Sequence, residues 1–337
     1  PVALVEVPAG KELEAIALLE ADPAVAYAET DALAFAPGAP APSIPMQPQA
    51  ASSPPAVSAT GYQPNDPGWA QQWAPRRIKA HEAWELTTGS AQVVVAVVDS
   101  GIDLTHPEFA GRLLPGFDYV QWDSQPQDEY GHGTHAAGII AASGDNGAGV
   151  AGLGWHVKIL PLRVLDRDGS GTASNVASAI SNAANQHADV INLSLALSGP
   201  NETVLNAILF ARGNGVAVVA SAGNDTQPGQ APAPVRYPAR YAEVIAVAAS
   251  THWEDWATYS NGGPEVDFAA PGGEASDPIL STGLSGGTAM LYGTSMAAAY
   301  VSGVMALLRS QTPDLTQNEI EQTLRATADK IGSYPYN

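Results

Sequence analysis

Four polar residues stand at positions where their side chains could together carry out acyl transfer. Asp99 ends the apolar run VVVAVV, His132 stands between two glycines, and Ser295 follows Gly-Thr just before a long apolar run. Asn224 follows another apolar run that ends in SAG. Acyl transfer needs four groups: a nucleophile, a base, an acid that orients the base, and an amide donor for the oxyanion.

Each of these residues, taken alone, also has a purely structural explanation. A serine before an apolar run commonly caps a buried helix, and an aspartate at a strand end commonly forms a turn. The spacing of His132 and His135 invites a metal site, but the chain has no cysteine and no His-Glu-x-x-His arrangement, so zinc is not expected. The glycines beside His132 instead predict an accessible imidazole that a substrate backbone can approach. The combination therefore favours catalysis more than any single motif does.

The elements that must position these side chains alternate between strands and helices from about residue 63 onward. Apolar strands are expected at the runs QVVVAVVDS, HVKILPLRVL, DVINLSL, VAVVASAG and VIAVAAS. Helices are expected over 172–188 and 201–215, and another follows a capping box of Thr316 with Glu319. Because the strands are apolar on both faces, the pattern predicts an α/β fold, a three-layer αβα domain with a mainly parallel central sheet.

Polar residues follow several of these strands directly. Asp99, Ser194 and Asn224 each come after an apolar run that reads as a buried strand. In parallel α/β sheets, ligands bind beyond the carboxyl ends of the strands. These three residues are therefore expected at one edge of the sheet, where a site should form.

Composition divides the chain into three parts. Residues 1–36 predict a small α+β unit, with a strand over 2–8, a helix over 9–23 and one or two strands over 25–36. Residues 37–62 carry no charge and are rich in proline and alanine, which predicts an exposed linker with a site for proteolytic processing. Residues 63–337 form the large domain.

Charge and composition exclude several classes of function. The 337 residues include 34 acidic and 14 basic ones, and the net charge of −20 argues against nucleic acid and anionic membranes as partners. Without cysteine, thiolate catalysis and thiolate metal sites are excluded. No apolar run is long enough to span a bilayer. The chain begins at Pro1 without a signal sequence, so we expect that an upstream segment has been removed or is not included in this sequence.

Seven motifs, spread over residues 63–332, resemble those of the subtilisin-like serine proteases, the subtilases, and among these the thermitase-type members. The motifs are VVDSGID, GHGTHAAG, INLSL, SAGN, YPARYAEVIAVAA, AAPG and GTSMA. The resemblance implies a serine endopeptidase of broad specificity. Three rival interpretations fit less well. A non-catalytic relative would lack a catalytic residue, and a sedolisin-like protease would use a Glu and an acidic oxyanion residue. An α/β-hydrolase esterase needs Gly-x-Ser-x-Gly, whereas residue 297 is Ala.

The resemblance also implies roles for single residues. Ser295 is the expected nucleophile, His132 the general base, Asp99 its orienting acid and Asn224 an oxyanion donor. A peptide substrate is expected to add as a strand between two edges of the cleft. These edges are Gly169, Ser170 and Gly171 on one side and Ser194, Leu195 and Ala196 on the other. Ala196 replaces a glycine usual in the family and is expected to reshape the primary pocket.

Calcium is the cofactor that the family implies, at one tight site and a second, weaker one. The tight site is matched by the side chains of Asp66, Glu108 and Asn146 and the carbonyls of Ser143, Ala148 and Val150. The weaker site is matched by Asp118, Asp123 and Gln127. Gln121 and Gln125 replace other usual ligands there, so its charge and its affinity are lower.

Residues 1–36 resemble the C-terminal half of the family's inhibitory propeptide, with AVAYAETDALAFA the most similar part. A fused accessory unit is the alternative. The resemblance implies a precursor inhibited and helped to fold by its own propeptide, cleavage within 36–62, polypeptide substrates, secretion and a monomeric enzyme. Ala299 and Tyr300 replace a usual Pro-His pair in the helix after Ser295, and we expect a more regular helix there.

Overall fold

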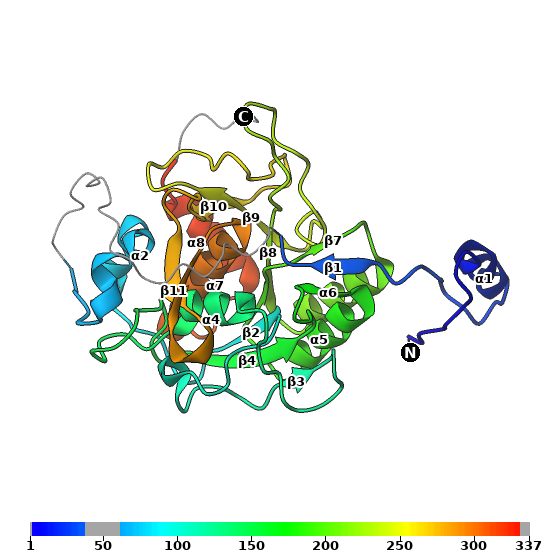
Figure 1. Cartoon of the computed structure of the whole chain (residues 1–337), viewed down its shortest axis with the longest axis horizontal. Coiled ribbons are helices and arrows are strands. Elements are labelled where there is room, and N and C mark those ends of the chain that lie inside the picture. Colours follow the sequence, from blue (N-terminus) through cyan, green and yellow to red (C-terminus); the bar gives the residue numbers. More distant parts are fainter. Residues whose placement is uncertain (1, 38–60, 331–337) are drawn as a thin grey trace.

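The computed structural model describes residues 2–37 and 61–330, and a seven-stranded parallel sheet forms its centre (Figure 1). The strand order is β10-β9-β8-β6-β2-β4-β3, and every neighbouring pair is parallel. The strands are β2 (Val94–Asp99), β3 (Phe117–Asp118), β4 (Lys158–Arg163), β6 (Val190–Leu193), β8 (Ala217–Ser221), β9 (Ile245–Ser250) and β10 (Phe268–Pro271). Their carboxyl ends meet at one edge, because parallel strands run in the same direction.

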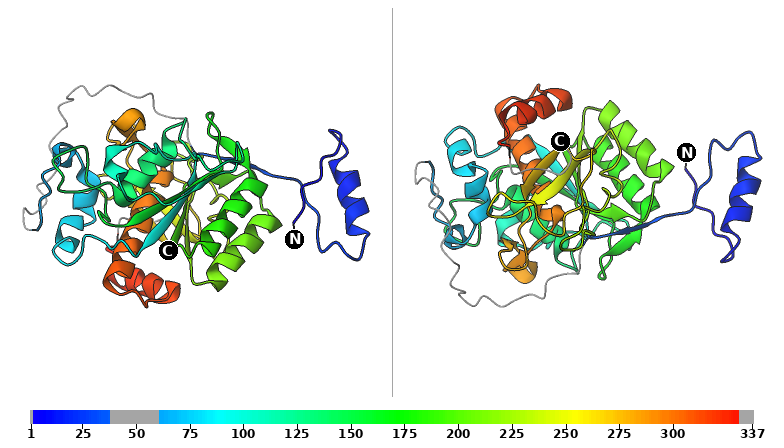
Figure 2. Two further views of the ribbon diagram at one scale, coloured as in Figure 1. Left: turned by 90° about the horizontal axis from the view of Figure 1, so that it is seen from below. Right: turned by 90° about the horizontal axis from the view of Figure 1, so that it is seen from above.

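Helices cover both faces of this sheet, as Figure 2 shows. In β2, Val95 and Val97 pack toward α4 (His132–Ala141) and α7 (Thr294–Gln311). The alternating residues Ala96 and Val98 pack toward α5 (Ala173–Asn185) and α6 (Glu202–Gly213) on the other face. The three-layer α/β fold predicted from the sequence is thereby confirmed.

Shorter elements complete the large domain. The predicted capping box is present, because Thr316 accepts a hydrogen bond from the Glu319 N–H and the Glu319 side chain accepts from Thr316. It begins α8 (Gln317–Thr327), and α7 before it runs without a break over eighteen residues. The other elements are η1 (Pro67–Ala70), α2 (Trp73–Arg77), α3 (Ala80–Ala83), η2 (Pro107–Phe109), β11 (Ile279–Thr282), η3 (Leu284–Gly286) and β12 (Thr288–Leu291).

The N-terminal part contributes one short strand that pairs with two strands of the large domain. β1 (Leu33–Phe35) lies between β5 (Ser170–Thr172) and β7 (Ala196–Leu197) and is antiparallel to both. The helix α1 (Glu12–Glu20) lies away from the body of the molecule (Figures 1 and 2).

The strand expected over 2–8 is wrong. No strand partner lies beside this segment among the described residues, and Val2 and Leu4 remain exposed, so there is no ladder to hold it. Most of the predicted linker, residues 38–60, lies outside the described residues, and the domain boundaries stay a prediction. None of the helices within 2–37 and 61–330 is both long and apolar enough to cross a membrane.

Candidate active site

Asp99 and His132 form a buried pair at the carboxyl edge of the sheet. Asp99 is the last residue of β2, and His132 is the first residue of α4. The Nδ1 atom of His132 lies 2.8 Å from Oδ1 and 2.9 Å from Oδ2 of Asp99. The carboxylate therefore fixes the ring so that its other nitrogen, Nε2, is the one available for proton transfer.

The surroundings of His132 favour its protonated form. Burial acts to lower the pKa of the imidazole, but the charge of Asp99 and its hydrogen bond outweigh burial, and the charge of Asp128 adds to them. The net effect is a raised pKa. An imidazole that holds a proton firmly can accept one during acyl transfer and return it to the leaving group.

A second buried carboxylate, Asp128, holds the loop that leads into α4. Its carboxylate accepts five hydrogen bonds. The donors are Ser100 Oγ at 2.9 Å, Tyr130 N at 2.9 Å, Gly131 N at 2.8 Å, Thr134 N at 2.9 Å and Thr134 Oγ1 at 2.6 Å. Burial raises the pKa of Asp128, and these hydrogen bonds act against that rise. Because every partner is a donor, the hydrogen bonds favour the ionised carboxylate. Asp128 thus ties the start of α4 to the residue that follows Asp99.

Ser295 occupies the first turn of α7, where backbone N–H groups have no partner within the helix. Its Oγ donates to the Ser194 carbonyl at 3.3 Å, and the Ser194 Oγ donates to the Ser295 carbonyl at 2.8 Å. The Nε2 of His132 is buried and has no hydrogen-bond partner in the described part of the chain. Serine and histidine are therefore not yet joined by a hydrogen bond in this state.

Asn224 directs its side-chain amide into the cleft beside Ser295. Its Oδ1 accepts from the N–H and the hydroxyl of Thr294, at 3.0 and 2.8 Å. Its Nδ2 is thereby turned outward and donates to the carbonyl of Pro37 at 2.9 Å. A Cβ on Gly293 would lie 2.9 Å from this Nδ2, so the bare backbone keeps the position beside it open. An amide held in this way can stabilise a developing oxyanion.

The cleft that leads to this amide is filled by the N-terminal part of the same chain. Phe35 pairs with Ser170 on one side and with Ala196 on the other, and Ala34 pairs with Gly171. The Ala36 N–H then donates to the Gly169 carbonyl at 3.0 Å. Residues 33–37 thus follow the path that the sequence predicts for a substrate, between the two predicted edges.

The residues around His132 show packing reasons for their type. A Cβ on Gly133 would lie 2.2 Å from the Gly101 carbonyl, so this glycine lets α4 pack against the end of β2. His135 makes a hydrogen bond through Nε2 to the Ile279 carbonyl at 3.0 Å, and burial lowers its pKa to about 3. His132 and His135 therefore have separate partners.

The residues predicted for the tight calcium site lie together. Asp66 accepts from the backbone N–H of Asn146 at 3.3 Å, and Glu108 accepts from its side-chain amide at 3.0 Å. Both acids are buried. Burial, together with the charge of Asp66, raises the pKa of Glu108 to about 7, although the hydrogen bond from Asn146 and the charge of Arg112 act in the opposite direction. Two adjacent buried carboxylates, beside the loop that carries the predicted carbonyl ligands of Ser143, Ala148 and Val150, are a donor set that fits Ca²⁺.

The residues predicted for the second calcium site fit the ion less well. Asp118 accepts from the buried Arg163 guanidinium at 3.1 Å, and its other oxygen accepts two backbone N–H groups. The oxygens of Asp123 and Gln127 accept from the N–H groups of Gln125 and Leu104. Arg163 already pairs with the one buried carboxylate of this set, and the second calcium site stays a prediction.

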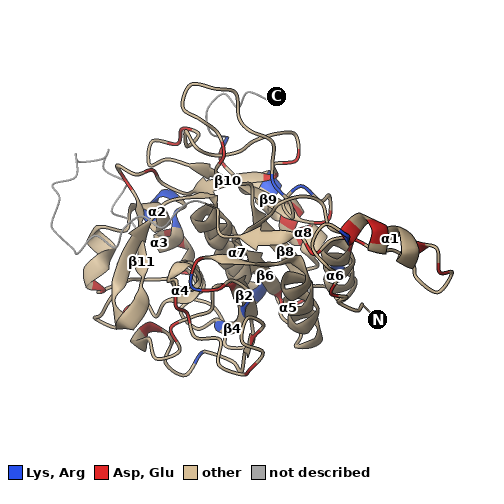
Figure 3. Cartoon of the chain, turned by 45° about the vertical axis from the view of Figure 1, so that its right-hand side comes forward, with Lys and Arg blue, Asp and Glu red and all other residues tan. Residues whose placement is uncertain are grey.

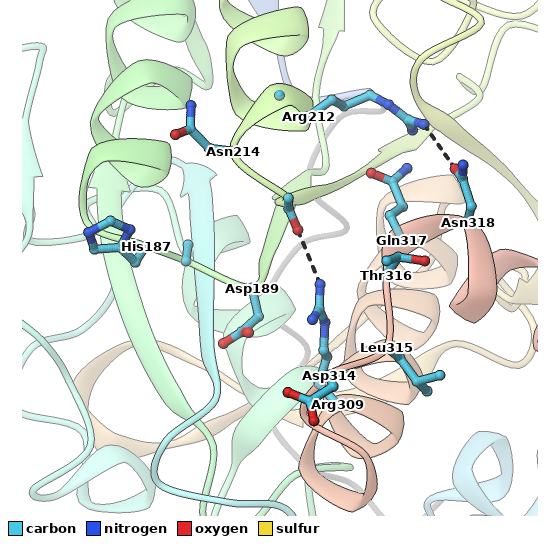
Figure 4. A pocket seen from close by; sticks show the side chains of 13 residues that line it. His187, Asp189, Arg212, Asn214, Arg309, Asp314, Leu315, Thr316, Gln317 and Asn318 are labelled. Carbon is cyan, nitrogen blue, oxygen red and sulfur yellow. Dashed lines mark hydrogen bonds between the residues drawn. The ribbon is translucent and has the colours of Figure 1, made fainter.

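A separate hollow of about 550 Å³ lies at the opposite edge of the sheet (Figure 4). Asp189, which precedes β6, accepts from the Val94 N–H, and Arg309 donates to the Gly215 carbonyl at 3.1 Å. Arg212 donates to Asn318 (Figure 4). These groups join the amino ends of the strands to α7 and α8 and lie far from Asp99 in the fold. The hollow is not part of the candidate active site.

Sequence reasoning missed three residues of the site. Asp128 precedes His132 by four residues, and an acid so close to a Gly-His motif was the signal available. Thr294 was seen only as part of Gly-Thr-Ser, although its hydroxyl fixes Asn224. The sequence predicts that Pro37 belongs to the linker, and only the folded chain brings its carbonyl to Asn224.

The fold and the site together define a class: α/β proteins with an Asp–His pair, a serine at a helix N-terminus and an amide donor beside it. The sequence profile described as "Subtilase family" matches residues 90–335. Among curated relatives, thermitase of Thermoactinomyces vulgaris is 42% identical over 273 residues, which cover 80% of this chain and 93% of thermitase. The chain therefore belongs to the subtilase family of serine peptidases, as its motifs predicted.

Further comparisons agree with this assignment. The thermophilic serine proteinase of Bacillus sp. (strain AK1) is 42% identical over 271 residues, which cover 80% of this chain and 65% of that protein. The chain thus spans about two thirds of that relative's length. A solved structure of a protease from Pseudoalteromonas arctica PAMC 21717 has a TM-score of 0.72 and 35% identity, covering 80% of this chain and 93% of that structure.

Proposed function

We propose that this chain is the precursor of an extracellular serine endopeptidase that cleaves polypeptides through an acyl-enzyme. The observation that carries the proposal is the occupied cleft. Residues 33–35 lie there as a strand, and the carbonyl of Pro37, two residues farther on, accepts a hydrogen bond from Asn224 beside Ser295. A substrate bound in the same way would present its reacting carbonyl to the same amide.

In the proposed reaction the Ser295 hydroxyl rotates from the Ser194 carbonyl toward Nε2 of His132. His132 takes the serine proton while Oγ attacks the substrate carbonyl, and Asp99 stabilises the resulting imidazolium. The oxyanion is held by the Asn224 amide and the Ser295 backbone N–H. His132 then gives the proton to the departing amine, and water releases the acyl group by the same steps in reverse.

Substrate recognition in this proposal depends mainly on backbone pairing. The edges β5 and β7 pair with residues 33–35 through main-chain groups, which every polypeptide carries. Backbone pairing does not distinguish side chains, so broad specificity is expected. Ala196, which pairs with Phe35, adds a methyl group to the wall of the cleft.

We infer that residues 1–37 act as an inhibitory propeptide and that the first cleavage follows Pro37. The carbonyl of Pro37 accepts a hydrogen bond from Asn224, the proposed oxyanion donor, so the bond that follows Pro37 would be the one presented to Ser295. Because the strand pairing does not depend on the cut, the cleaved segment would remain in the cleft until it dissociates or is degraded. The same contacts support an aid to folding, since they bring β5 and β7 together.

We further propose that calcium bound by Asp66, Glu108 and Asn146, with the carbonyls of Ser143, Ala148 and Val150, stabilises the enzyme. The ion would offset the repulsion between two buried carboxylates and takes no part in the reaction. Secretion is proposed because a halolysin-like relative from Natrialba magadii, 38% identical to this chain, is named as an extracellular serine protease. A monomer remains our prediction.

Hydrolysis of casein by the processed protein tests the proposed activity. We expect a serine-directed organophosphonate and the Ser295→Ala change each to abolish it. Asn224→Ala should fold normally and lose about 100- to 1,000-fold in turnover, because one oxyanion donor is removed. Casein hydrolysis that persists in Ser295→Ala, or near-normal turnover in Asn224→Ala, would contradict the assigned roles.

A further inference from the structure

The segment before β1 places two carboxylates on the N-termini of two neighbouring helices. Glu29 accepts hydrogen bonds from the N–H groups of Glu202 and Thr203, both at 2.8 Å, and from the Thr203 hydroxyl at 2.6 Å. These groups belong to the first turn of α6. The positive end of the helix dipole adds to the attraction.

Asp31 makes the equivalent contact with α5. It accepts from the N–H of Ser174 at 2.8 Å and from its hydroxyl at 2.6 Å. The helices α5 and α6 lie side by side on the same face of the sheet, as Figures 1 and 2 show. Two acids that are two residues apart in an extended segment can therefore reach both helix ends at once.

These contacts use donors that the helices do not satisfy themselves. The cap of α5 is Thr172, whose hydroxyl accepts from Asn175, and the cap of α6 is Asn201, whose side chain accepts from Val204. The caps leave the N–H groups of Ser174, Glu202 and Thr203 to the carboxylates. Once residues 1–37 have left, these donors face the path of any chain that enters the cleft.

Overall charge does not explain this docking. Residues 1–37 carry seven acids and one lysine, and the rest of the chain carries 27 acids and 13 bases, so both parts are negative. Figure 3 shows acidic residues on α1 as well as on the large domain. The attraction must therefore be local, at the two helix ends.

We propose that these helix ends form an extended substrate subsite for acidic side chains, which rests on the proposed peptidase function. With the residue whose carbonyl meets Asn224 counted as the first, Asp31 is the seventh and Glu29 the ninth toward the N-terminus. The pairing of β1 with β5 and β7 fixes this spacing for any peptide bound in the same register. The favoured substrates are polypeptides with acids seven and nine residues before the cleaved bond.

Kinetics with matched peptides test the proposal on processed enzyme freed of residues 1–37. One peptide carries Glu-Thr-Asp-Ala-Leu-Ala-Phe-Ala-Pro before Gly-Ala-Pro-Ala, a second has Gln and Asn in place of Glu and Asp, and a third begins at the alanine after Asp. We expect the acidic peptide to have a KM about 3- to 30-fold lower than the second, from two helix-end interactions. The kcat values should be similar, because the reacting groups are unchanged.

Enzyme variants locate the effect. Ser174→Asp with Thr203→Asp places the enzyme's own carboxylates in the first helical turns, where they are compatible with folding, and should remove the advantage of the acidic peptide. Asn206→Asp, which adds the same charge at an exposed position farther along α6, should leave most of it. Equal KM values for the acidic and amide peptides would overturn the subsite and leave the peptidase standing. If the enzyme cleaves none of the three peptides and also leaves casein intact, the proposed function would instead be rejected.

Discussion

At the scale of single residues, the site combines one hydrogen-bonded pair with groups that hold it in place. Asp99 orients His132, and Thr294 orients Asn224. Asp128 holds the loop that leads to His132. Asp128 touches no reacting atom, so it is a positioning residue. Its charge nevertheless reaches His132, where it helps to raise the pKa of the imidazole.

Asp128→Asn should therefore change both rate and pH dependence. One amide cannot accept all five hydrogen bonds, and the displaced loop is expected to lower kcat roughly 10- to 100-fold. His132 must be neutral to accept a proton, so kcat/KM rises as the pH passes through the pKa of His132. Loss of the Asp128 charge lowers that pKa, and the acidic limb of kcat/KM against pH should move to lower pH.

Other charges near His132 do not alter this expectation. Asp99 remains in the variant. Tyr130 and His135 also face the ring, but both are uncharged over the acidic limb, because the pKa of Tyr130 is raised and that of His135 is about 3. Asp168→Asn removes a charge from an exposed side chain and is the matched control, with no shift expected. An acidic limb that stays in place in Asp128→Asn would show that Asp128 acts only through structure.

At the scale of elements, the cleft consists of two short strands with room for a third strand between them. β5 and β7 have three and two residues, too few to form a stable sheet without the strand between them. β1 supplies that strand, and its pairing uses backbone groups on both sides. Inhibition and substrate binding are thus expected to depend on the same ladder.

A peptide of residues 27–37 should inhibit the processed enzyme, and its Ala34→Pro version should inhibit at least about 10-fold less. Proline removes the N–H of Ala34 and cannot continue a central strand. Leu33→Ala is the control, because the Leu33 side chain is 63% exposed and should contribute little. The measurement is Ki against a chromogenic peptide. Equal Ki values for the native and Ala34→Pro peptides would be inconsistent with binding by strand addition.

The sequence was sufficient for the parts of the molecule that depend on local pattern. The alternation of apolar strands with helices predicted the sheet, and strand ends such as Asp99 predicted its active edge. The partner of Asn224 could not be predicted, because Pro37 lies 187 residues away from it in the chain and is brought near it by the pairing of β1. The contact of Arg163 with Asp118, a residue of the second predicted calcium set, could not be predicted for a similar reason, since Arg163 comes from β4 and no local motif reveals it.

At the scale of the whole molecule, a low content of charged residues, 14%, goes with a net charge of −20. Most of the excess acids are exposed, but Asp66 and Glu108 are buried close to each other. Such a pair destabilises a fold unless a cation or protons neutralise it. The proposed calcium ion joins η1, η2 and the loop after α4, and so ties the beginning of the large domain to the helix of His132.

Removal of calcium should therefore lower the unfolding temperature of the whole domain. With the inactive Ser295→Ala protein, which avoids self-digestion, we expect a chelator to lower Tm by about 5–10 °C in differential scanning calorimetry. Glu108→Gln should abolish most of this response, whereas Asp123→Asn should keep it. The same Tm with and without chelator would argue against the site.

Intact-mass measurement of the purified chain, followed from the earliest times, tests the central claim most directly. We expect the native sequence to release a fragment of residues 1–37, ending at Pro37, while Ser295→Ala remains a single uncut chain. Later trimming of the linker would not change the mass of that first fragment. A native chain that stays intact while it hydrolyses casein, a first cut elsewhere, or the same cut in Ser295→Ala would contradict an active site occupied by its own substrate-like strand.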